Sequence, residues 1–589
     1  MVTDPKERIR STFESARRQT ATALLIVALV IPAAARNRKL ANDLSQSGNG
    51  AIEVIVQFTT VPNQSHYAKI SRRGGTVKHD LSVIKGLHAS MTPAQIDSLA
   101  ADPEVTHISP NRKVAGYLNN AAPAVNAPYA WAMGLDGAHI SVAVIDSGIG
   151  DKKNAGFKKS DLNKWNTGSS RVVYSQSWVD DGNGARDAYG HGTHVAGVLA
   201  GNGYNSTGSE YTQTFKGIAP NVNLVVLRVL DGNGMGTDSA VIAAIQTAIQ
   251  LKDKYNIRVI NLSLGRPVLE SYLVDPLCQA VEAAYQAGIV VVVAAGNDGR
   301  DNSEGTNGYA TITAPGNDPF VITVGAMKSM GTPTRTDDLI ATYSSKGPTA
   351  IDHIVKPDLV APGNKTIAVL AAPDAAIATE YPQNLVPLSY YTTTGSYAGS
   401  MSYFTLSGTS MATPVVSGAV ALLLQAQPNL TPDQVKARLM KTAYKTFPSY
   451  SSYTDPTTGT TYTSQYDAFT IGAGYVDIQA ALSSTDLSSG AAKSPSAQYD
   501  PTTNNVYFVA DSSAMWGSSA MWGTAAVWGS NVFVGSQSAM WGSSAMWGSS
   551  AMWGSSTTQG FSAMWGSSAM WGSNADSTES IAIQISGEN

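Results

Sequence analysis

The sequence predicts an α/β fold with a mostly parallel, doubly wound sheet covered by helices on both faces. Runs rich in valine and isoleucine are apolar almost throughout, which is typical of strands buried on both sides. Amphipathic helical patterns, such as 238–255 and 275–288, lie between several of these runs, and this alternation favours parallel pairing. In such sheets, functional residues gather at the carboxyl ends of strands. The apolar runs are 139–146, 222–230, 257–265, 289–297 and 320–326.

Changes in composition divide the 589-residue chain into five segments. The first, 1–35, carries arginines ahead of an apolar run and ends in three alanines that suit a cleavage site. This pattern predicts a secretory signal peptide, with an uncleaved membrane anchor as the alternative. We therefore expect a bacterial protein that is secreted or held at the cell surface. The other segments are a linker (36–50), a small domain (51–118), a large domain (119–483) and a tail (484–589).

The small domain, 51–118, mixes strand and helix patterns. Strand-like stretches at 51–58 and 105–111 flank a helix-like stretch at 92–102. We expect a small α+β module.

Composition also limits the class of partner. The net charge is −4 and no basic cluster is present in the sequence, so we expect no nucleic-acid partner. Cys278 is the single cysteine, which leaves no intrachain disulfide. Because Cys278 lies in an amphipathic helical pattern, we interpret it as a buried structural thiol. Near the end of the large domain, Thr431 and Gln434 have the spacing of a capping box that begins a helix.

Three motifs of the large domain carry the residue types of nucleophilic catalysis. Asp146 ends the first apolar strand, and His191 lies between two glycines before a helix of small residues. Ser410 begins an apolar helix, and Pro414 falls in the first turns, where proline is tolerated. A serine hydroxyl is a weak nucleophile that needs a base, and the base needs a buried carboxylate to orient it. Together these residues predict acyl transfer.

The choice of base is narrow, because 119–589 contains four histidines. Two of them, His191 and His194, share a helical face, so a zinc site is the alternative. The i, i+4 histidine pair with an intervening glutamate that zinc proteases use is absent from the sequence. We interpret His194 as a hydrogen-bonded structural residue. The four histidines are His139, His191, His194 and His353.

An oxyanion formed by acyl transfer needs hydrogen-bond donors. Ser410 at a helix start supplies its own N–H and the positive end of the helix dipole. Asn297 follows a buried strand at the same predicted edge of the sheet, and we interpret its amide as a second donor. A simple turn-forming role is the alternative for Asn297.

The stretches VAVIDSGI, GHGTHVAG, SLG, AAGN and GTSMATP occur in this order and resemble the motifs of subtilisin-like serine proteases (subtilases). The resemblance covers about residues 122–443. It implies a subtilisin-like fold and a serine endopeptidase that acts on polypeptides and requires no cofactor for its chemistry. Carried over by motif, Asp146, His191 and Ser410 form the catalytic triad, and Asn297 completes the oxyanion hole.

The same resemblance implies a peptide-binding cleft of broad specificity. Two short segments look like strands that sandwich an extended peptide through backbone hydrogen bonds. One departure is Arg266, where many relatives have glycine, followed by an insert-like stretch to residue 276. The substrate-binding residues implied are Gly234, Met235, Gly236, Ser263, Leu264 and Gly265.

The resemblance also implies that the small domain is a propeptide, which assists folding and inhibits the cleft. We expect self-cleavage near Tyr117–Ala122, with a permanent N-terminal domain as the alternative. Structural calcium is common among subtilases, and Asp161 resembles one ligand position. The loop 202–215 departs from the usual calcium loop, so no ligand set is assigned. An inactive scaffold on a protease fold is a further interpretation, as is an adhesin whose main function lies in the tail.

The tail contains a hexad repeat, WGSSAM, that carries eight tryptophans. Because six is an even period, an extended chain places every tryptophan on one face, whereas a helix forms no single apolar stripe. Two interpretations remain, a stacked β-rich repeat and a low-complexity chain. No lysine or arginine follows Lys493, so polyanions are disfavoured, and the partner stays open between a cell surface and a polysaccharide. The tryptophans are Trp516, Trp522, Trp528, Trp541, Trp547, Trp553, Trp565 and Trp571.

Overall fold

The chain forms two compact units, Met1–Val114 (unit 1) and Ala115–Asn589 (unit 2). The predicted signal peptide and all eight repeat tryptophans lie outside the residues that the structure describes. The computed structural model describes residues 37, 39–41, 44, 50–110, 120–150, 160–165, 167–303, 305–488, 490–500, 505–509, 532–534 and 585–588.

Unit 1 has an α+β architecture in its described residues, with an antiparallel sheet in the order β2-β3-β1-β4. Leu40 and Leu44, which belong to the predicted linker, are buried in its core. The linker prediction therefore missed that these leucines pack on the unit. The elements are β1 (Ile52–Phe58), α2 (Gln64–Arg72), β2 (Thr76–Leu81), η1 (Ser82–Ile84), β3 (Gly86–Met91), α3 (Pro93–Ala100) and β4 (Val105–Pro110).

Unit 2 is built on an eight-stranded sheet, which has the order β11-β10-β9-β8-β5-β7-β6 with β12 paired to β10. Every pairing is parallel except that of β10 with β11. The strands are β5 (Ser141–Asp146), β6 (Val172–Ser177), β7 (Asn223–Arg228), β8 (Ile257–Leu262), β9 (Val290–Ala294), β10 (Ile322–Lys328), β11 (Leu339–Ile340) and β12 (Leu359–Pro362).

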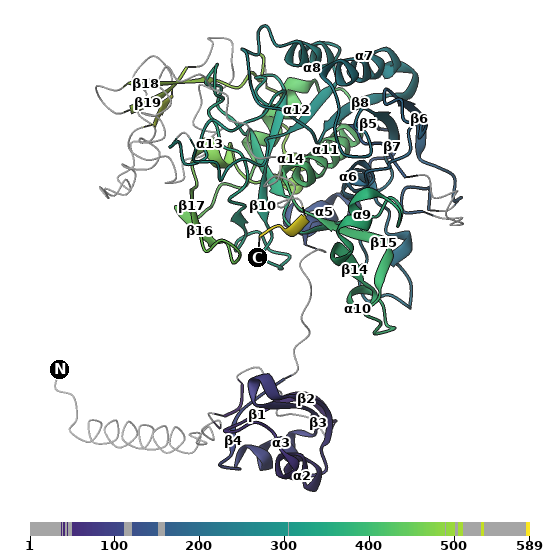
Figure 1. The fold of residues 1–589 in the computed structure, drawn as a ribbon. Coiled ribbons are helices and arrows are strands. Elements are labelled where there is room, and N and C mark those ends of the chain that lie inside the picture. Colours follow the sequence, from purple (N-terminus) through teal and green to yellow (C-terminus); the bar gives the residue numbers. More distant parts are fainter. Residues whose placement is uncertain are drawn as a thin grey trace, which may run out of the picture. The chain divides into compact units, whose positions relative to one another are not determined.

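Helices cover both faces of this sheet. Successive residues of a strand point to opposite faces, so alternate residues of β5 pack against different helices. Ala143 and Ile145 of β5 pack with α7 (Asp238–Tyr255) and α8 (Pro276–Gln286). The alternate residues Val142 and Val144 belong to the core that includes α6 (His191–Ala200) and α11 (Thr409–Ala426). Figure 1 shows α7 and α8 side by side at one edge of the unit, with α11 and α6 nearer its middle. The predicted doubly wound α/β fold is confirmed.

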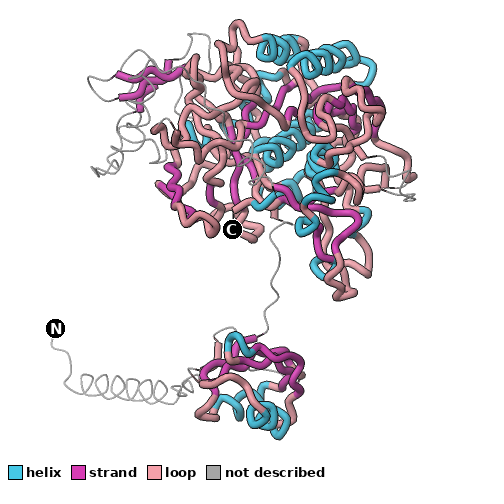
Figure 2. Tube along the Cα trace, viewed as in Figure 1, coloured by secondary structure: helices cyan, strands magenta, loops and turns pink. Residues whose placement is uncertain are grey.

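Long loops and short elements complete unit 2 (Figure 2). The remaining helices are α4 (Ala121–Ala124), α5 (Ala127–Ala132), η3 (Tyr204–Ser206), α9 (Ala376–Glu380), η4 (Pro382–Asn384), α10 (Leu388–Tyr391), α12 (Pro432–Thr442), α13 (Ala468–Ile471) and α14 (Ile478–Ser483). The remaining strands are β13 (Thr366–Val369), β14 (Leu385–Pro387), β15 (Gly399–Leu406), β16 (Tyr450–Thr454), β17 (Thr461–Gln465), β18 (Ser496–Asp500), β19 (Asn505–Val509) and β20 (Val532–Val534).

The core of unit 2 continues beyond Ser483, where the sequence predicts that the large domain ends. Ala497, Val506 and Phe508 are buried in the main core, and the Phe508 ring lies 5.7 Å from that of Phe469. β18, β19 and β20 form a small sheet of their own. These described parts of the predicted tail are thus structural components of unit 2.

Helix α11 is long and apolar enough to cross a membrane, and it is the one helix among the described residues that meets this test. Its most apolar window is 89% buried within the protein. Packing inside unit 2 therefore accounts for its composition.

The predicted capping box at the start of α12 is confirmed. The Thr431 side chain accepts from the Gln434 N–H at 3.2 Å, and the Thr431 N–H donates to Gln434 Oε1 at 3.1 Å. Thr431→Ala should lower the free energy of unfolding by about 1 kcal/mol, because the Gln434 N–H at the helix start loses its side-chain acceptor. Guanidinium unfolding measures this change, and Thr460→Ala, at an exposed turn position, is the control. Equal effects of the two substitutions would contradict the cap.

Candidate active site

Asp146 and His191 form a buried hydrogen-bonded pair at the carboxyl end of β5. The Asp146 Oδ1 to His191 Nδ1 distance is 2.8 Å, and both side chains are buried. Gly192 permits this approach, because a Cβ there would lie 2.4 Å from the Gly148 carbonyl oxygen and 3.1 Å from Asp146 Oδ1. Burial lowers the pKa of His191, but the charge of Asp146 and its hydrogen bond outweigh burial and raise the pKa above its usual value.

A second buried carboxylate, Asp187, fixes the loops that hold this pair. Asp187 accepts hydrogen bonds from Ser147 Oγ at 2.8 Å and from the Thr193 N–H at 2.7 Å. Ser147 Oγ in turn accepts from the Gly192 N–H at 2.8 Å. Asp187 thereby joins the end of β5 to the start of α6. The sequence prediction missed this role, although Asp187 lies four residues before His191.

Ser410 is the second residue of α11, and Pro414 lies within the helix rather than in its first turn. This corrects the prediction that Pro414 sits where proline is tolerated. Proline has no N–H and crowds the carbonyl four residues earlier, so the Ser410 carbonyl loses its usual helical donor. Ser263 Oγ replaces that donor and binds the Ser410 carbonyl oxygen at 2.8 Å. Asn261 donates to Ser263 Oγ at 3.0 Å and completes the link from β8 to α11.

The hydroxyl of Ser410 donates to the Ser263 carbonyl oxygen at 3.2 Å. His191 Nε2 is buried and has no hydrogen-bond partner among the described residues. Both side chains line the same cleft. Proton transfer between the two side chains would require the Ser410 Oγ to rotate from the Ser263 carbonyl oxygen toward His191 Nε2. Catalytic hydrogen bonds are often long without substrate and shorten when it binds.

Asn297 follows β9 and is oriented by the residue before Ser410. Its Oδ1 accepts from the Thr409 N–H at 2.9 Å and from Thr409 Oγ1 at 3.1 Å. Two donors on the oxygen leave the Nδ2 group as the end that can donate to a ligand. Asn297 also lines the cleft that contains His191 and Ser410.

The cleft has a volume of about 420 Å³. Three of the four candidate catalytic residues, His191, Asn297 and Ser410, line the cleft, together with every predicted substrate-binding residue. Neither predicted peptide-binding segment is paired as a strand, and both are loops at the carboxyl ends of strands. Met235 is 68% exposed, and Asp231 holds its loop by accepting from the Met235 N–H at 3.0 Å. The predicted lining residues are Gly234, Met235, Gly236, Ser263, Leu264 and Gly265.

Arg266, the departure noted in the sequence, also lines the cleft. Its guanidinium binds Asp238 Oδ1 at 3.0 Å through Nε and Asp275 Oδ1 at 2.8 Å through Nη2. Burial lowers its pKa, and the two carboxylates outweigh burial and raise it. The carboxylates of Asp238 and Asp275 therefore balance the positive charge of the Arg266 guanidinium and hold the loop that follows Gly265 in place.

His194 and Cys278 have the structural roles predicted for them. His194 Nε2 lies 3.1 Å from the Thr366 carbonyl oxygen and 3.0 Å from that of Phe404. Burial, with the nearby His191, lowers the pKa of His194 to about 3, so the ring is neutral. The Cys278 thiol is buried and donates to Asn317 Oδ1 at 3.2 Å.

Asp161, at the suggested calcium position, is hydrogen-bonded to the protein. Asp161 accepts from the Asn205 N–H at 2.8 Å and from the Tyr403 hydroxyl at 2.6 Å. Both carboxylate oxygens are therefore satisfied by protein donors. Within the described ranges, no group of three or more His, Cys, Asp or Glu residues could hold a metal ion.

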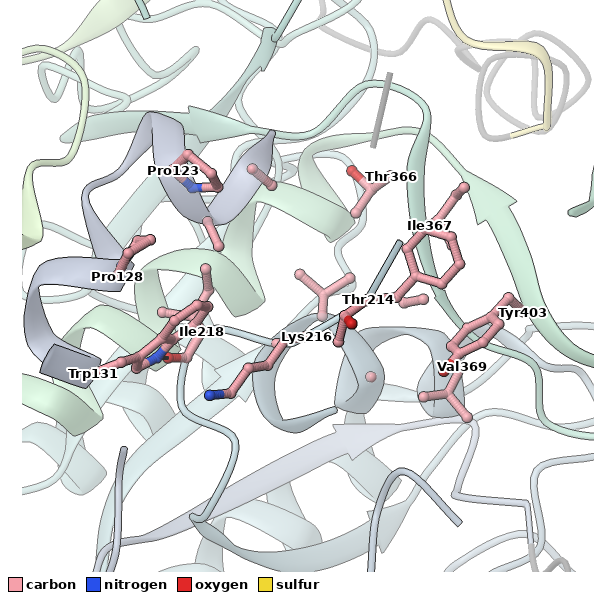
Figure 3. Close-up of a pocket in the computed structure, with 17 residues that line it drawn as sticks. Pro123, Pro128, Trp131, Thr214, Lys216, Ile218, Thr366, Ile367, Val369 and Tyr403 are labelled. Atoms are coloured by element: carbon pink, nitrogen blue, oxygen red, sulfur yellow. Dashed lines mark hydrogen bonds between the residues drawn. The ribbon is translucent and has the colours of Figure 1, made fainter. Parts of the chain in front are cut away.

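A second cavity, of about 200 Å³, lies in unit 2. Figure 3 shows Trp131, Lys216 and Ile218 on one side of it and Ile367 and Tyr403 on the other. Its lining is mostly apolar, and none of the four candidate catalytic residues contributes to it. Trp131 Nε1 donates to the Ile218 carbonyl oxygen at 3.0 Å, so this wall is already fixed by the protein itself.

The replacement of a helical donor by Ser263 can be tested with a double-mutant cycle. Ser263→Ala should lower the free energy of unfolding by about 1–3 kcal/mol, because the buried Ser410 carbonyl loses its donor. Adding Pro414→Ala restores a backbone N–H four residues after that carbonyl, so the double variant should recover part of the loss. Pro414→Ala alone is the control. Purely additive effects in guanidinium unfolding would contradict the exchange of donors.

Comparison with known proteins also relates this chain to the subtilases. A model of the subtilase family matches residues 137–476. Serine protease AprX of Bacillus subtilis is 36% identical over 371 residues, covering 62% of this chain and 75% of the relative. Subtilisin DY of Bacillus licheniformis is 33% identical, covering 61% and 96%, and an extracellular serine proteinase of Thermus is 31% identical, covering 61% and 71%.

Among solved structures, a cold adapted subtilisin-like serine proteinase matches with a TM-score of 0.37 and 29% identity, covering 56% of this chain and 89% of that one. The family match spans more than half of the chain and includes all four candidate catalytic residues. The chain belongs to the subtilase family and is a serine endopeptidase that acts on polypeptides.

Proposed function

We propose that Asp146, His191 and Ser410 form the catalytic triad of this endopeptidase, with Asn297 in the oxyanion hole. The observation that carries the proposal is the buried 2.8 Å contact between Asp146 and His191. It lies beside a cleft that His191, Ser410 and Asn297 line together. The alternative of a simple turn role for Asn297 does not account for its two hydrogen bonds from Thr409.

The reaction follows from these positions. Ser410 Oγ attacks the peptide carbonyl carbon while His191 Nε2 accepts its proton, and Asp146 stabilises the resulting imidazolium. The oxyanion receives hydrogen bonds from Asn297 Nδ2 and from the Ser410 N–H, which is free at a helix start. His191 then donates its proton to the leaving amine. Water, deprotonated by His191, attacks the acyl ester and releases the second product.

We further propose that the protein is exported and removes unit 1 from itself. The pattern at 1–35 supports export, as does the name of the extracellular Thermus relative. Unit 1 is a compact α+β module separate from the catalytic unit, as a removable inhibitor requires. The cleft is lined by the loops that contain Gly234–Gly236 and Ser263–Gly265, and recognition of the peptide backbone by these loops would give broad specificity.

Replacing the nucleophile tests the proposed triad and the self-processing together. Wild-type protein should react with a serine-directed phosphonate at Ser410 and should begin near residues 117–122 after purification. Ser410→Ala should give no adduct and should retain unit 1, because both reactions need the Ser410 oxygen. Mass spectrometry and N-terminal sequencing give the two readouts. Identical N-termini in both proteins would contradict self-cleavage, and an unlabelled wild-type Ser410 would favour an inactive scaffold.

The raised pKa of His191 predicts a specific acid limb. Only neutral His191 can accept the serine proton, so kcat/KM should fall as pH drops through a pKa above its usual value. Asp146→Asn removes the charge that raises this pKa, so burial then dominates and the limb moves to lower pH. Activity should also drop about 10⁴-fold.

The pH dependence of kcat/KM on a chromogenic peptide measures both effects. Asp374→Asn is the matched control, because Asp374 is exposed and pairs with Arg186 at 2.7 Å outside the cleft lining. An acid limb that stays in place in Asp146→Asn would show that Asp146 does not set the pKa of His191.

A further inference from the structure

Residues Ile585–Glu588, which we call the anchor segment, lie against unit 2 more than seventy residues after β19. Figure 1 shows this short yellow segment on the body of the unit. Glu588 is only 1% exposed, which is rare for a glutamate unless it is paired. Its carboxylate is therefore expected to have strong partners.

The Glu588 carboxylate lies in a pocket of donors. Oε1 is 3.0 Å from Arg300 Nη2, and Oε2 is 3.0 Å from Lys328 Nζ. The Thr342 N–H donates to Oε1 at 2.7 Å. The contact with Lys328 is an ion pair. The three partners come from the loop after β9, from the end of β10 and from the segment after β11. Three separate parts of unit 2 thus converge on one side chain.

The backbone of the anchor segment is recognised as well. Asn364 Nδ2 donates to the Glu588 carbonyl oxygen at 2.7 Å, and the Glu588 N–H donates to Asn364 Oδ1 at 2.8 Å. Asn384 Nδ2 donates to the Ile585 carbonyl oxygen at 2.6 Å. Gly587 has a φ of 58°, and a Cβ on it would lie 2.3 Å from Ser407 Oγ. Binding of the anchor segment to the pocket therefore depends on glycine at position 587 as well as on the charge of Glu588.

The pocket needs an acidic occupant. The side chains of Arg300 and Lys328 are 7% and 5% exposed, and buried cations are costly without partners. Arg300 also binds Asp455 at 3.2 Å and lies over the Tyr462 ring at 4.6 Å. Among the described residues, Lys328 forms its ion pair with Glu588 alone. Removal of Glu588 would leave Lys328 buried without a carboxylate.

The pocket also adjoins the loop that leads to the nucleophile. Asn364 follows Gly363, whose carbonyl oxygen accepts from the Gly408 N–H at 2.8 Å. Gly408 precedes Thr409 and Ser410. The anchor segment therefore binds the side chain of the residue next to the one whose carbonyl holds Gly408, just before α11.

We propose that this pocket is a specific binding site for an acidic peptide, and that its ligand is the chain's own anchor segment. The other end of the tail is held by Val506 and Phe508 in the main core. Described residues on both sides of the repeats, Val506 and Phe508 before them and the anchor segment after them, are therefore held by unit 2. A single cut within the repeats would leave both cut ends attached to the catalytic unit.

The test uses a chain that ends at Gln584 and a fluorescent peptide of sequence IQISGEN, which corresponds to residues 583–589. The peptide should bind the shortened chain and raise its melting temperature with increasing concentration. Binding to the full chain should be at least about 10-fold weaker, because the site is already filled. A matched peptide with glutamine in place of Glu588 should bind the shortened chain about 100-fold more weakly, because the buried cations lose a charged partner.

Two variants of the full chain test the same contact without shortening it. Glu588→Gln and Gly587→Ala should both lower the melting temperature, and Glu588→Gln should also increase binding of the added peptide. Glu270→Gln, at an exposed position, is the matched control and should change neither quantity.

Several outcomes would overturn the proposal. They are no binding of IQISGEN to the shortened chain, equal binding of the two peptides, or equal binding to full and shortened chains. A full chain that is dimeric, and becomes monomeric in Glu588→Gln, would show that the segment binds a second copy rather than its own.

Discussion

The hydrogen bond from Ser263 Oγ to the Ser410 carbonyl oxygen connects the central sheet to the helix that carries Ser410. It exists because Pro414 removes the helical donor of that carbonyl. A second polar contact in the same interface joins Ser417 Oγ of α11 to Asn261 Oδ1 at 2.8 Å. α11 is buried along nearly its whole length, where apolar packing has no directional preference. These polar contacts therefore fix the rotation and the axial position of α11 relative to the sheet, and with them the position of Ser410.

The histidine is controlled by a balance of two opposed electrostatic effects. Burial alone would make His191 a poor proton acceptor, as it does for His194, three residues later on the same helix. Asp146 reverses the effect at one position because, of the two histidines, its carboxylate hydrogen-bonds to His191. Asp187 maintains that asymmetry by holding the start of α6 and the loop after β5 together. Neighbouring histidines can thus have opposite protonation behaviour within a single helix.

Much of the fold and most of the candidate site could be predicted from local sequence. Asp146, Ser263 and Asn297 all lie at or near the ends of apolar runs, and parallel strands bring their carboxyl ends to one edge of the sheet. The sequence around Ser410 predicts the start of a helix, and α11 does begin there, at Thr409. Contacts between residues distant in sequence could not be predicted in this way. The role of Ser263 depends on Pro414, and the burial of Leu40 and Leu44 depends on the surface of unit 1.

The contacts of Glu588 show most clearly that pairings between distant residues cannot be predicted from local sequence. Glu588 is one acidic residue in a polar stretch, and no local pattern distinguishes it from an exposed glutamate. Its partners lie near residues 300, 328, 342 and 364, so only the folded unit reveals the pocket. Removing everything after Ser483 would delete core residues at 497, 506 and 508 together with the anchor segment. Loss of activity in such a chain would follow from damage to the core, whatever the repeats do. The function of the tryptophan repeats can therefore be separated from catalysis only by changes confined to residues 510–584.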